Sequence, residues 1–319
     1  MSLSVYCQRL RPFVWNALES GKRMKNTKKR FFRPIIQLLS TLALNLNITG
    51  FAEGSIYTGH FKGVCIPVLN CYSCPGALGA CPIGALQSSF AAIGGKIAYY
   101  VLGMLLLFAL TLGRFFCGWL CPFGALQGLL HKVPVRKAEI PKRADAALRY
   151  LKYAVLVVLV VALPLFMRNG VDMSAPYFCK WLCPAGTLEG GVPLALTNEM
   201  VRGALGAQFA WKLSLAVGIV VLCLFLYRPF CKYLCPLGAF YGLFSKLSLY
   251  RYAVDSNACT QCGACRRACK MGVDPMREPN SRECIRCGDC KRACPVGALK
   301  NSTCFGEQKQ DSIEKGDVR

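Results

Sequence analysis

Histidine and acidic residues are scarce in this sequence of 319 residues. The two histidines, His60 and His131, lie outside the apolar segments, which excludes a haem held by two histidines within a membrane. The chain has 16 acidic residues against 39 basic ones, and its apolar half holds neither a carboxylate pair nor a Ser-His-Asp set suited to hydrolysis. No glycine-rich dinucleotide fingerprint and no P-loop occurs. Hydrolytic and nucleotide-dependent activities are therefore not expected.

The net charge of +23 does not by itself indicate a nucleic-acid partner. The basic residues stand beside apolar runs, where they set the orientation of membrane segments, and no nucleic-acid-binding motif is present. Apolar residues make up 54% of the chain, a high fraction for a soluble protein of this charge. The composition predicts membrane segments joined to a polar domain, with membrane lipid as a partner and no nucleic acid.

Cysteine is abundant, with 21 residues, and two copies of C-x2-C-x2-C-x3-C occur near the C-terminus. This spacing wraps a loop around a [4Fe–4S] cluster, with three close thiolates on one cluster and the fourth on the other. The alternatives are two zinc sites or a disulfide cluster, but zinc motifs usually pair two C-x2-C units without the third cysteine and the x3-C extension. The predicted ligands of the first cluster are Cys259, Cys262, Cys265 and Cys294, and those of the second are Cys284, Cys287, Cys290 and Cys269.

The segment that holds these cysteines resembles a bacterial two-cluster ferredoxin over about fifty residues. Lys270 stands where proline often follows the fourth cysteine, a departure that leaves the ligands intact. Because cluster ligands are reduced thiolates, this segment is expected in the cytoplasm. Basic residues beside the ligands predict an acidic redox partner steered by charge, or else they balance the anionic clusters. These residues are Arg266, Arg267, Lys270, Arg286, Lys291 and Arg292.

Four apolar segments are candidates for membrane spans: Ile35 to Phe51, Ile97 to Gly113, Tyr150 to Met167 and Leu213 to Tyr227. Each is near or slightly below the ~20 residues that a span requires. A buried helix of a soluble protein is the alternative for any one of them, but four in one chain favour membrane insertion. Nine basic residues precede the first segment and eight lie from Arg114 through Lys152, against one and three in the other two loops. This distribution predicts that both termini are cytoplasmic.

A motif of the form C-P-x-G-[A/T]-[L/F] occurs five times, beginning at Cys81, Cys121, Cys183, Cys235 and Cys294. Since Cys294 is assigned as a ferredoxin ligand, the other four are predicted to be ligands as well. Proline suits the first helical position, so the helix points its free amides at the cluster sulfurs, and the glycine allows close packing. Burial as small apolar packing residues is the alternative.

Spans and motifs alternate in the same order in both halves, which indicates a parallel duplication about an axis along the membrane normal. Such a fold brings Cys117 and Cys121 beside Cys231 and Cys235 at the cytoplasmic boundary, enough thiolates for one cluster. On the outer side the sequence has five candidate cysteine ligands, one more than a single cluster needs, and Cys65 would be a sixth. The sequence does not decide which of them is not a ligand. The outer candidates are Cys71, Cys74, Cys81, Cys179 and Cys183. Three cysteines match no motif and are interpreted as structural: Cys7, Cys223 and Cys304.

The expected fold class is a mainly α, polytopic membrane protein, with four transmembrane helices in two parallel repeats and a small C-terminal α+β ferredoxin domain. The expected divisions are residues 1–34 as a basic cytoplasmic segment, 35–137 and 138–250 as the membrane repeats, 251–304 as the two-cluster ferredoxin domain, and 305–319 as a flexible tail. No removable signal peptide is expected. The stretch from Tyr6 to Leu18 is either a short helix on the membrane surface or part of an untethered tail.

The motifs Cys117-Gly-Trp-Leu-Cys121-Pro and Cys231-Lys-Tyr-Leu-Cys235-Pro, followed by the eight ferredoxin cysteines, resemble the NapH-type membrane ferredoxins. The resemblance covers about residues 97 to 300. It implies a quinol-oxidising subunit of the kind that serves periplasmic nitrate reductase and related chains. This sequence departs from the pattern in its additional cysteines at 71–81 and 179–183. These favour an electron route that reaches the outer face.

The expected function is that of a membrane-bound electron-transfer subunit of an oxidoreductase, such as a quinol dehydrogenase. Its cofactors would be two [4Fe–4S] clusters in the ferredoxin domain and one or two more at the membrane. The hydrocarbon core is ~30 Å thick, too far for one electron step, so either the cysteine loops enter the membrane or a quinone, flavin or further cofactor bridges the gap. Partners are expected on the cytoplasmic side and on the extracytoplasmic side, and the direction of flow is open.

Two other functions compete with electron transfer. The C-x3-C-P cysteines could hold copper, because the chain also resembles membrane polyferredoxins that assist copper assembly of oxidases, or the protein could be a redox sensor. The sequence has no tract rich in methionine or histidine for copper, which favours electron transfer. Trp119, Phe123 and Trp181 are candidates for a quinone pocket, or belong to aromatic belts at the membrane surface.

Overall fold

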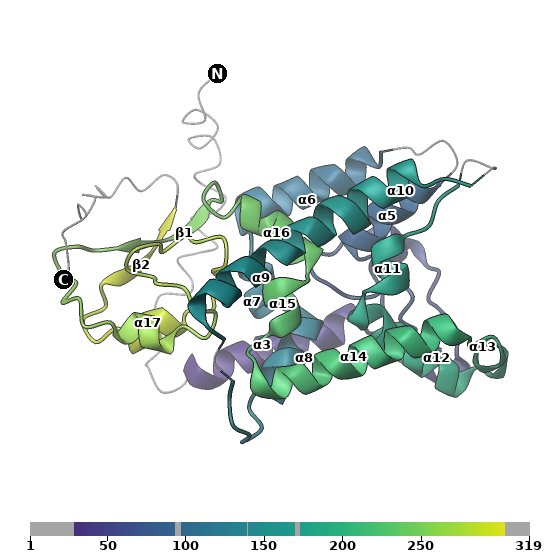
Figure 1. Cartoon of the computed structure of the whole chain (residues 1–319), viewed down its shortest axis with the longest axis horizontal. Coiled ribbons are helices and arrows are strands. Elements are labelled where there is room, and N and C mark those ends of the chain that lie inside the picture. The colour runs from purple at the N-terminus through teal and green to yellow at the C-terminus, as the bar shows by residue number, and fades with distance from the viewer. Residues whose placement is uncertain (1–28, 93–96, 139, 170–172, 304–319) are drawn as a thin grey trace.

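The structure is a computed structural model that describes residues 29–92, 97–138, 140–169 and 173–303. Long helices fill most of the molecule, and β1, β2 and α17 lie together at one end of it (Figure 1). The fold is mainly helical, as the sequence predicts. The expected surface helix between Tyr6 and Leu18, the cysteines Cys7 and Cys304, and the tail 305–319 lie outside the described residues.

Helices occupy all four positions at which the sequence predicts a membrane span: α3 (Lys29–Leu44), α6 (Tyr99–Thr111), the continuous helix Lys142–Phe166, and α14 (Ala207–Phe225). Two of them are long and apolar enough to cross a membrane, namely Lys142–Phe166 with 25 residues and Ala207–Phe225 with 19. The apolar helices Phe32–Leu44 and Tyr99–Thr111 are shorter.

The first helix ends earlier than the sequence predicts because two asparagines stop it. Asn45 donates from Nδ2 to the Thr41 carbonyl at 2.9 Å, and Asn47 donates to the Pro75 carbonyl at 2.8 Å. Asparagine side chains compete in this way with the helical backbone ladder. The chain then leaves the helix and forms the short helix α4 (Thr49–Glu53).

The helix Lys142–Phe166 changes its winding along its length. It begins as α9 (Lys142–Ala154), becomes π-helical over η2 (Val155–Ala162) and ends as α10 (Leu163–Phe166). Gln87 donates from Nε2 to the Leu159 carbonyl at 2.7 Å, within the π-helical part. An inserted side chain of this kind is a recognised cause of local rewinding.

Short helices flank the cysteines of both halves. In the three C-x3-C-P motifs, a five-residue helix precedes the second cysteine. A second helix begins at the proline that follows this cysteine, as the sequence predicts. The fifth copy differs, since Cys294 is followed by a turn that leads directly into a strand. The elements are η1 (His60–Gly63), α5 (Pro82–Ala91), α7 (Phe115–Trp119), α8 (Pro122–Leu130), α11 (Tyr177–Trp181), a helix over 184–197 that includes η3 (Gly186–Gly191) and α12 (Val192–Thr197), α13 (Glu199–Gly203), α15 (Pro229–Tyr233) and α16 (Pro236–Leu243).

The C-terminal part consists of two cysteine loops, two short helices and a small sheet. β1 (Tyr250–Val254) pairs antiparallel with β2 (Leu299–Thr303), and α17 (Ala264–Ala268) and α18 (Asp289–Ala293) follow the loops. The loops repeat one backbone conformation. Gln261 and Arg286 have φ of 54° and 52°, and the glycine two residues later in each loop also has positive φ. The repeated C-x2-C spacing therefore produces the same local turn twice.

Candidate metal centres

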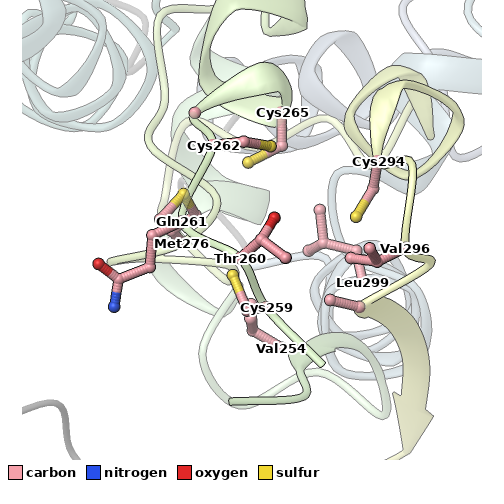
Figure 2. Close-up of a pocket in the computed structure, with 12 residues that line it drawn as sticks. Val254, Cys259, Thr260, Gln261, Cys262, Cys265, Met276, Cys294, Val296 and Leu299 are labelled. Carbon is pink, nitrogen blue, oxygen red and sulfur yellow. The ribbon is translucent and has the colours of Figure 1, made fainter. Parts of the chain in front are cut away.

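The first predicted ferredoxin ligand set lines one pocket. Figure 2 shows Cys259, Cys262, Cys265 and Cys294 around it. Cys294 is 29 residues or more from the other three and reaches them because α18 lies beside α17. Cys262 is exposed, so this pocket lies at the surface of the protein.

The second predicted ligand set lines a separate pocket. Cys269, Cys284, Cys287 and Cys290 surround it together with Tyr252 and Ile285. The fourth cysteine of each motif thus lies with the first three of the other motif, which is the crossed arrangement that two-cluster ferredoxins use. The donor set in each pocket is four thiols, the number that one [4Fe–4S] cluster takes.

The inner cysteines of the two halves also come together, on α7–α8 and α15–α16. The Cys231 thiol interacts electrostatically with those of Cys117 and Cys121, and the Cys235 thiol interacts with all three. The Gly124 N–H donates to Cys121 Sγ at 3.3 Å, and the Gly238 N–H donates to Cys235 Sγ at 3.4 Å. These four thiols, with backbone amides directed at them, fit the anionic cluster that the repeat predicts.

Two buried arginines at this inner set each bind a backbone carbonyl of the other half of the chain. The sequence motifs did not predict this role. Arg228 Nη1 donates to the Cys117 carbonyl at 2.7 Å, and Arg114 Nη2 donates to the Cys231 carbonyl at 3.2 Å. Their side chains are 1% and 0% exposed. The available signal was the arginine three residues before the first cysteine in both inner motifs. Each half therefore holds the cysteine loop of the other.

The charge of the inner set favours an anionic occupant. Within the described part of the chain Arg228 has no carboxylate partner, and the Nε groups of both Arg114 and Arg228 lack hydrogen-bond partners. A buried cation is costly unless an opposite charge lies near it. Burial raises the pKa of Cys117 to about 11, while Arg114 and Arg228 oppose this increase. The arginines thus stabilise negative charge on the sulfurs.

Four of the outer cysteines share a cavity of about 300 Å³: Cys71, Cys81, Cys179 and Cys183. Cys74 does not line this cavity, and its Sγ lies 3.6 Å from Asn45 Oδ1. Cys65 is buried in a short backbone bridge to Ala80. Among the described residues, no three histidine, cysteine or acidic side chains are grouped so as to hold a single metal ion.

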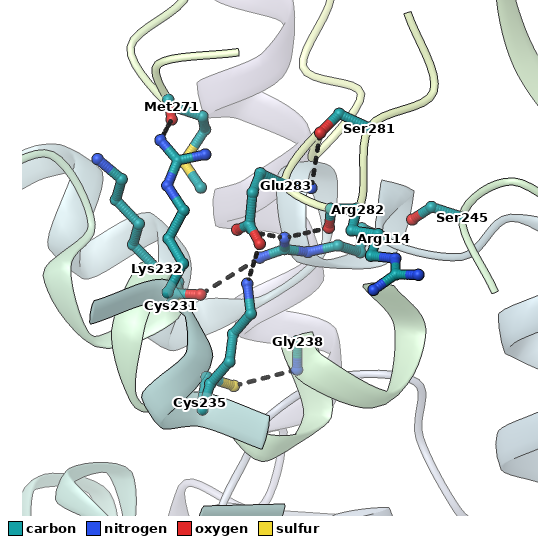
Figure 3. A network of polar contacts seen from close by, with 12 residues as sticks. Arg114, Cys231, Lys232, Cys235, Gly238, Ser245, Met271, Ser281, Arg282 and Glu283 are labelled. Atoms are coloured by element: carbon teal, nitrogen blue, oxygen red, sulfur yellow. Dashed lines mark hydrogen bonds and ion pairs between the residues drawn. The ribbon is translucent and has the colours of Figure 1, made fainter. Parts of the chain in front are cut away.

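The ferredoxin part is fixed to the inner cysteines by a buried ionic network (Figure 3). Glu283 Oε2 accepts from Arg114 Nη1 at 3.1 Å, and Glu283 Oε1 pairs with Lys152. Arg114 also donates to the Arg282 carbonyl at 2.6 Å. Because Glu283 directly precedes Cys284, this network holds the second ferredoxin pocket against the inner set.

Arg286 lies in this interface and not on the basic surface that the sequence predicts. It is 2% exposed, and it donates to the carbonyls of Leu112 at 2.7 Å and Ser245 at 2.9 Å. Its own carbonyl accepts from Trp119 Nε1 at 3.0 Å. Arg286 has positive φ, and the charge pattern could not show that its side chain is buried.

The three aromatic residues considered for a quinone pocket make separate contacts. Trp119 stacks on Phe115, Phe123 packs in the core against Phe230, and Trp181 is 43% exposed on α11. The structure therefore does not support a shared quinone pocket at these residues. The two histidines are also apart from the cysteine pockets, with His131 at the end of α8 against Tyr227.

Gly118 is one point at which the second ferredoxin loop touches the inner loop. A Cβ atom at this position would lie 2.2 Å from the Ile285 carbonyl oxygen, so any side chain must displace the backbone. We expect Gly118→Ala to lower the free energy of unfolding by about 1–3 kcal/mol. Urea denaturation followed by cluster absorbance measures this change.

Gly103→Ala is the matched control for that substitution. A Cβ at Gly103 on α6 meets nothing within 4 Å, so alanine there should be neutral or stabilise by up to ~1 kcal/mol. Equal unfolding midpoints for the two variants would contradict the close approach at Gly118.

Comparison with known proteins agrees with these centres. Residues 97–141, 153–192 and 209–251 match one 4Fe-4S binding domain family, and residues 278–300 match a second 4Fe-4S binding domain family. The first covers three of the four Cys-Pro motifs of the helical body, and the second covers the last ferredoxin loop. No solved structure matches the chain.

Three curated relatives are similar to this chain over most of its length. The protein MJ0750 of Methanocaldococcus jannaschii is 32% identical over 221 residues, which cover 67% of this chain and 81% of that protein. The putative electron transport protein YccM of Escherichia coli is 29% identical over 207 residues, 61% of this chain and 54% of YccM. The methylamine utilization ferredoxin-type protein MauN of Methylorubrum extorquens is 28% identical over 229 residues, 68% of this chain and 70% of MauN.

The domain matches and the four-thiol pockets define a class: this is a ferredoxin-type iron–sulfur protein with 4Fe-4S binding domains. Within that class, the chain belongs to the family that includes MJ0750 of Methanocaldococcus jannaschii.

Proposed function

We propose that this protein relays single electrons through a membrane, between a cytoplasmic partner and a quinone or an extracytoplasmic redox protein. The observation that carries the proposal is the contact between Ile285, which lies within the second ferredoxin loop, and Gly118, which lies between Cys117 and Cys121. When bound, [4Fe–4S] clusters supply single-electron transfer. The names of YccM, a putative electron transport protein, and MauN, a ferredoxin-type protein, support this role.

Tyr241 extends the series from the inner cysteines to the outer ones. It is fully buried and donates to the Pro67 carbonyl at 3.2 Å. Its phenol interacts electrostatically with Cys81 of the outer set and with Cys117, Cys121 and Cys235 of the inner set. The cysteine loops thus reach toward each other, which favours the expectation that they enter the membrane over the alternative of a bridging quinone or flavin.

We infer that the helical body spans the membrane four times with both termini in the cytoplasm. The two long apolar helices and the two shorter ones support membrane association. The basic residues concentrate in residues 1–34 and from Arg114 to Lys152, where they favour the cytoplasmic side. This orientation keeps the exposed thiol of Cys262 in a reducing compartment.

Vesicles test the relay directly. Purified protein is reconstituted into liposomes that contain trapped ferricyanide, and dithionite is added outside; neither reagent crosses the bilayer readily. We expect ferricyanide to be reduced far faster than in vesicles without protein. A sensor or a copper-handling factor gives no such flow, so a rate equal to that of empty vesicles would overturn the proposal.

The exposed first ferredoxin pocket is the proposed contact site for an acidic cytoplasmic partner. Arg266 has a side chain that is 59% exposed, and Arg267 donates to the Cys262 carbonyl at 3.2 Å. Replacing both with glutamate should slow reduction by an acidic electron-transfer protein about 10-fold or more at low salt, and should flatten the salt dependence of that rate. Stopped-flow absorbance at several ionic strengths measures both effects.

Arg202→Glu is the control for this charge reversal. Arg202 is also exposed and pairs with Glu199, but it lies on α13 at the opposite end of the molecule (Figure 1). Its reversal should leave the rate of cytoplasmic reduction unchanged. If instead the two arginines serve only to balance the clusters, their reversal will shift the reduction potential without changing the salt dependence.

A further inference from the structure

The outer cavity has the features of a further metal centre. We propose that it holds a [4Fe–4S] cluster through Cys71, Cys81, Cys179 and Cys183, and that Cys74 is the spare cysteine. The four proposed ligands line the cavity, two from each half of the chain. This inference extends the proposed relay and depends on it only for the direction in which electrons leave.

The pairing of cysteines between the halves identifies the ligands. A Cβ on Gly84 would lie 3.8 Å from Cys179 Sγ, and a Cβ on Gly186 would lie 3.6 Å from Cys71 Sγ. Each outer glycine therefore lies against the first cysteine of the other half. This crossed relation makes Cys71 the counterpart of Cys179, although their spacings to the following Cys-Pro differ.

The position of Cys74 gives the same set. Cys74 does not line the cavity, and its Sγ lies 3.6 Å from Asn45 Oδ1. Four of the five outer cysteines thus face one space.

The outer set also repeats the backbone geometry of the inner set. The Gly84 amide donates to the Cys81 thiol, and the Gly186 amide donates to Cys183 Sγ at 3.4 Å. The same donor, three residues after the cysteine, occurs at both inner Cys-Pro motifs. Cys81 and Cys183 thus receive the same backbone donor as Cys121 and Cys235 of the inner set, which supports a ligand role for both.

The charges around the cavity favour an anionic occupant. Lys212 lines it and has no carboxylate partner in the described part of the chain. The nearby Glu189 accepts from the Cys71 backbone amide at 2.9 Å. A free ammonium beside four thiols suits an anionic polyatomic group.

Cys71 and Cys74 are three residues apart, and only Cys71 is a proposed ligand, so replacing each in turn tests the assignment. Protein carrying Cys71→Ser, Cys74→Ser or Cys179→Ser is purified without oxygen, and its iron and acid-labile sulfide are measured together with its EPR spectrum. We expect Cys71→Ser and Cys179→Ser each to lose about four iron atoms per chain, the content of one cluster, and Cys74→Ser to lose none. Ferredoxin signals should be the same in all three, which shows that the chain remains folded.

The inference is overturned if Cys74→Ser loses as much iron as Cys71→Ser, or if Cys71→Ser and Cys179→Ser both keep the full content. Lys212→Gln gives an independent measurement, since removal of a cation should shift the potential of one cluster to more negative values and leave the ferredoxin potentials unchanged. The vesicle assay distinguishes this site from the relay. If the iron contents of the variants are as expected but the protein does not reduce trapped ferricyanide, the relay is rejected and the outer cluster site is retained.

Discussion

Replacing Cys231 with serine is expected to stop electron flow into vesicles and to remove about four iron atoms per chain. The Cys231 thiol interacts with all three other thiols of the inner set and accepts a hydrogen bond from Gln127 Nε2 at 3.0 Å. Because the inner set lies between the ferredoxin loops and the outer cavity, its loss should reduce ferricyanide reduction to the rate of empty vesicles. Iron analysis, EPR and the vesicle assay measure the result.

Cys223→Ala is the control for this experiment. Cys223 is also buried, on α14, but belongs to no motif. It should keep the full iron content and the full rate of transfer. A Cys231→Ser protein that transfers electrons normally would show that the inner thiols carry no part of the route.

Replacing Glu283 with alanine is expected to destabilise the docked ferredoxin part by about 3–5 kcal/mol. The substitution leaves Arg114 and Lys152, both 0% exposed, without their shared carboxylate. Loss of one partner from a buried ionic group is far costlier than loss of an exposed pair. Urea denaturation followed by cluster absorbance, together with limited proteolysis near residue 250, measures the change.

Glu199→Ala provides the comparison, because Glu199 pairs with Arg202 at 3.0 Å in an exposed position and should contribute at most ~1 kcal/mol.

Acid should reproduce the Glu283 effect. Burial raises the pKa of Glu283, but Arg114 and Lys152 lower it more, so its folded-state pKa lies below the ordinary value. The contribution of Glu283 to the free energy of unfolding is therefore fully present above pH ~4.3. This contribution is lost as the pH falls through the lower folded-state pKa. Equal unfolding midpoints for Glu283→Ala and the unmodified protein would contradict the network.

The ferredoxin cysteines could be grouped from the sequence because the grouping is a local property. In C-x2-C-x2-C-x3-C the spacing fixes how a loop turns, and the positive φ at Gln261 and Arg286 shows the same turn twice. The inner cysteines could be grouped because one motif recurs in both halves. The grouping of the outer cysteines required the structure, since the spacing between Cys71 and Cys81 has no equal in the second half.

What the sequence could not predict depends on contacts between distant segments. Arg114 and Arg228 looked like ordinary flanking charges of membrane helices, yet each binds a carbonyl more than a hundred residues away. Arg286 looked like a surface charge and is buried. The sequence also places the end of α3 too late, because Asn45 and Asn47 bond to Asn70 and Pro75 of a folded loop, in addition to the bond from Asn45 to Thr41 within the helix.

The position of Glu283 late in the chain has a consequence for biogenesis. During synthesis, every helix from α3 to α16 leaves the ribosome before this carboxylate exists. Until then Arg114 and Lys152 have no counter-charge from it, and Gly118 lacks its contact with Ile285. Arrival of the last sixty or so residues neutralises the cations and completes this contact. The helical body is therefore synthesised before the segment that neutralises its buried cations.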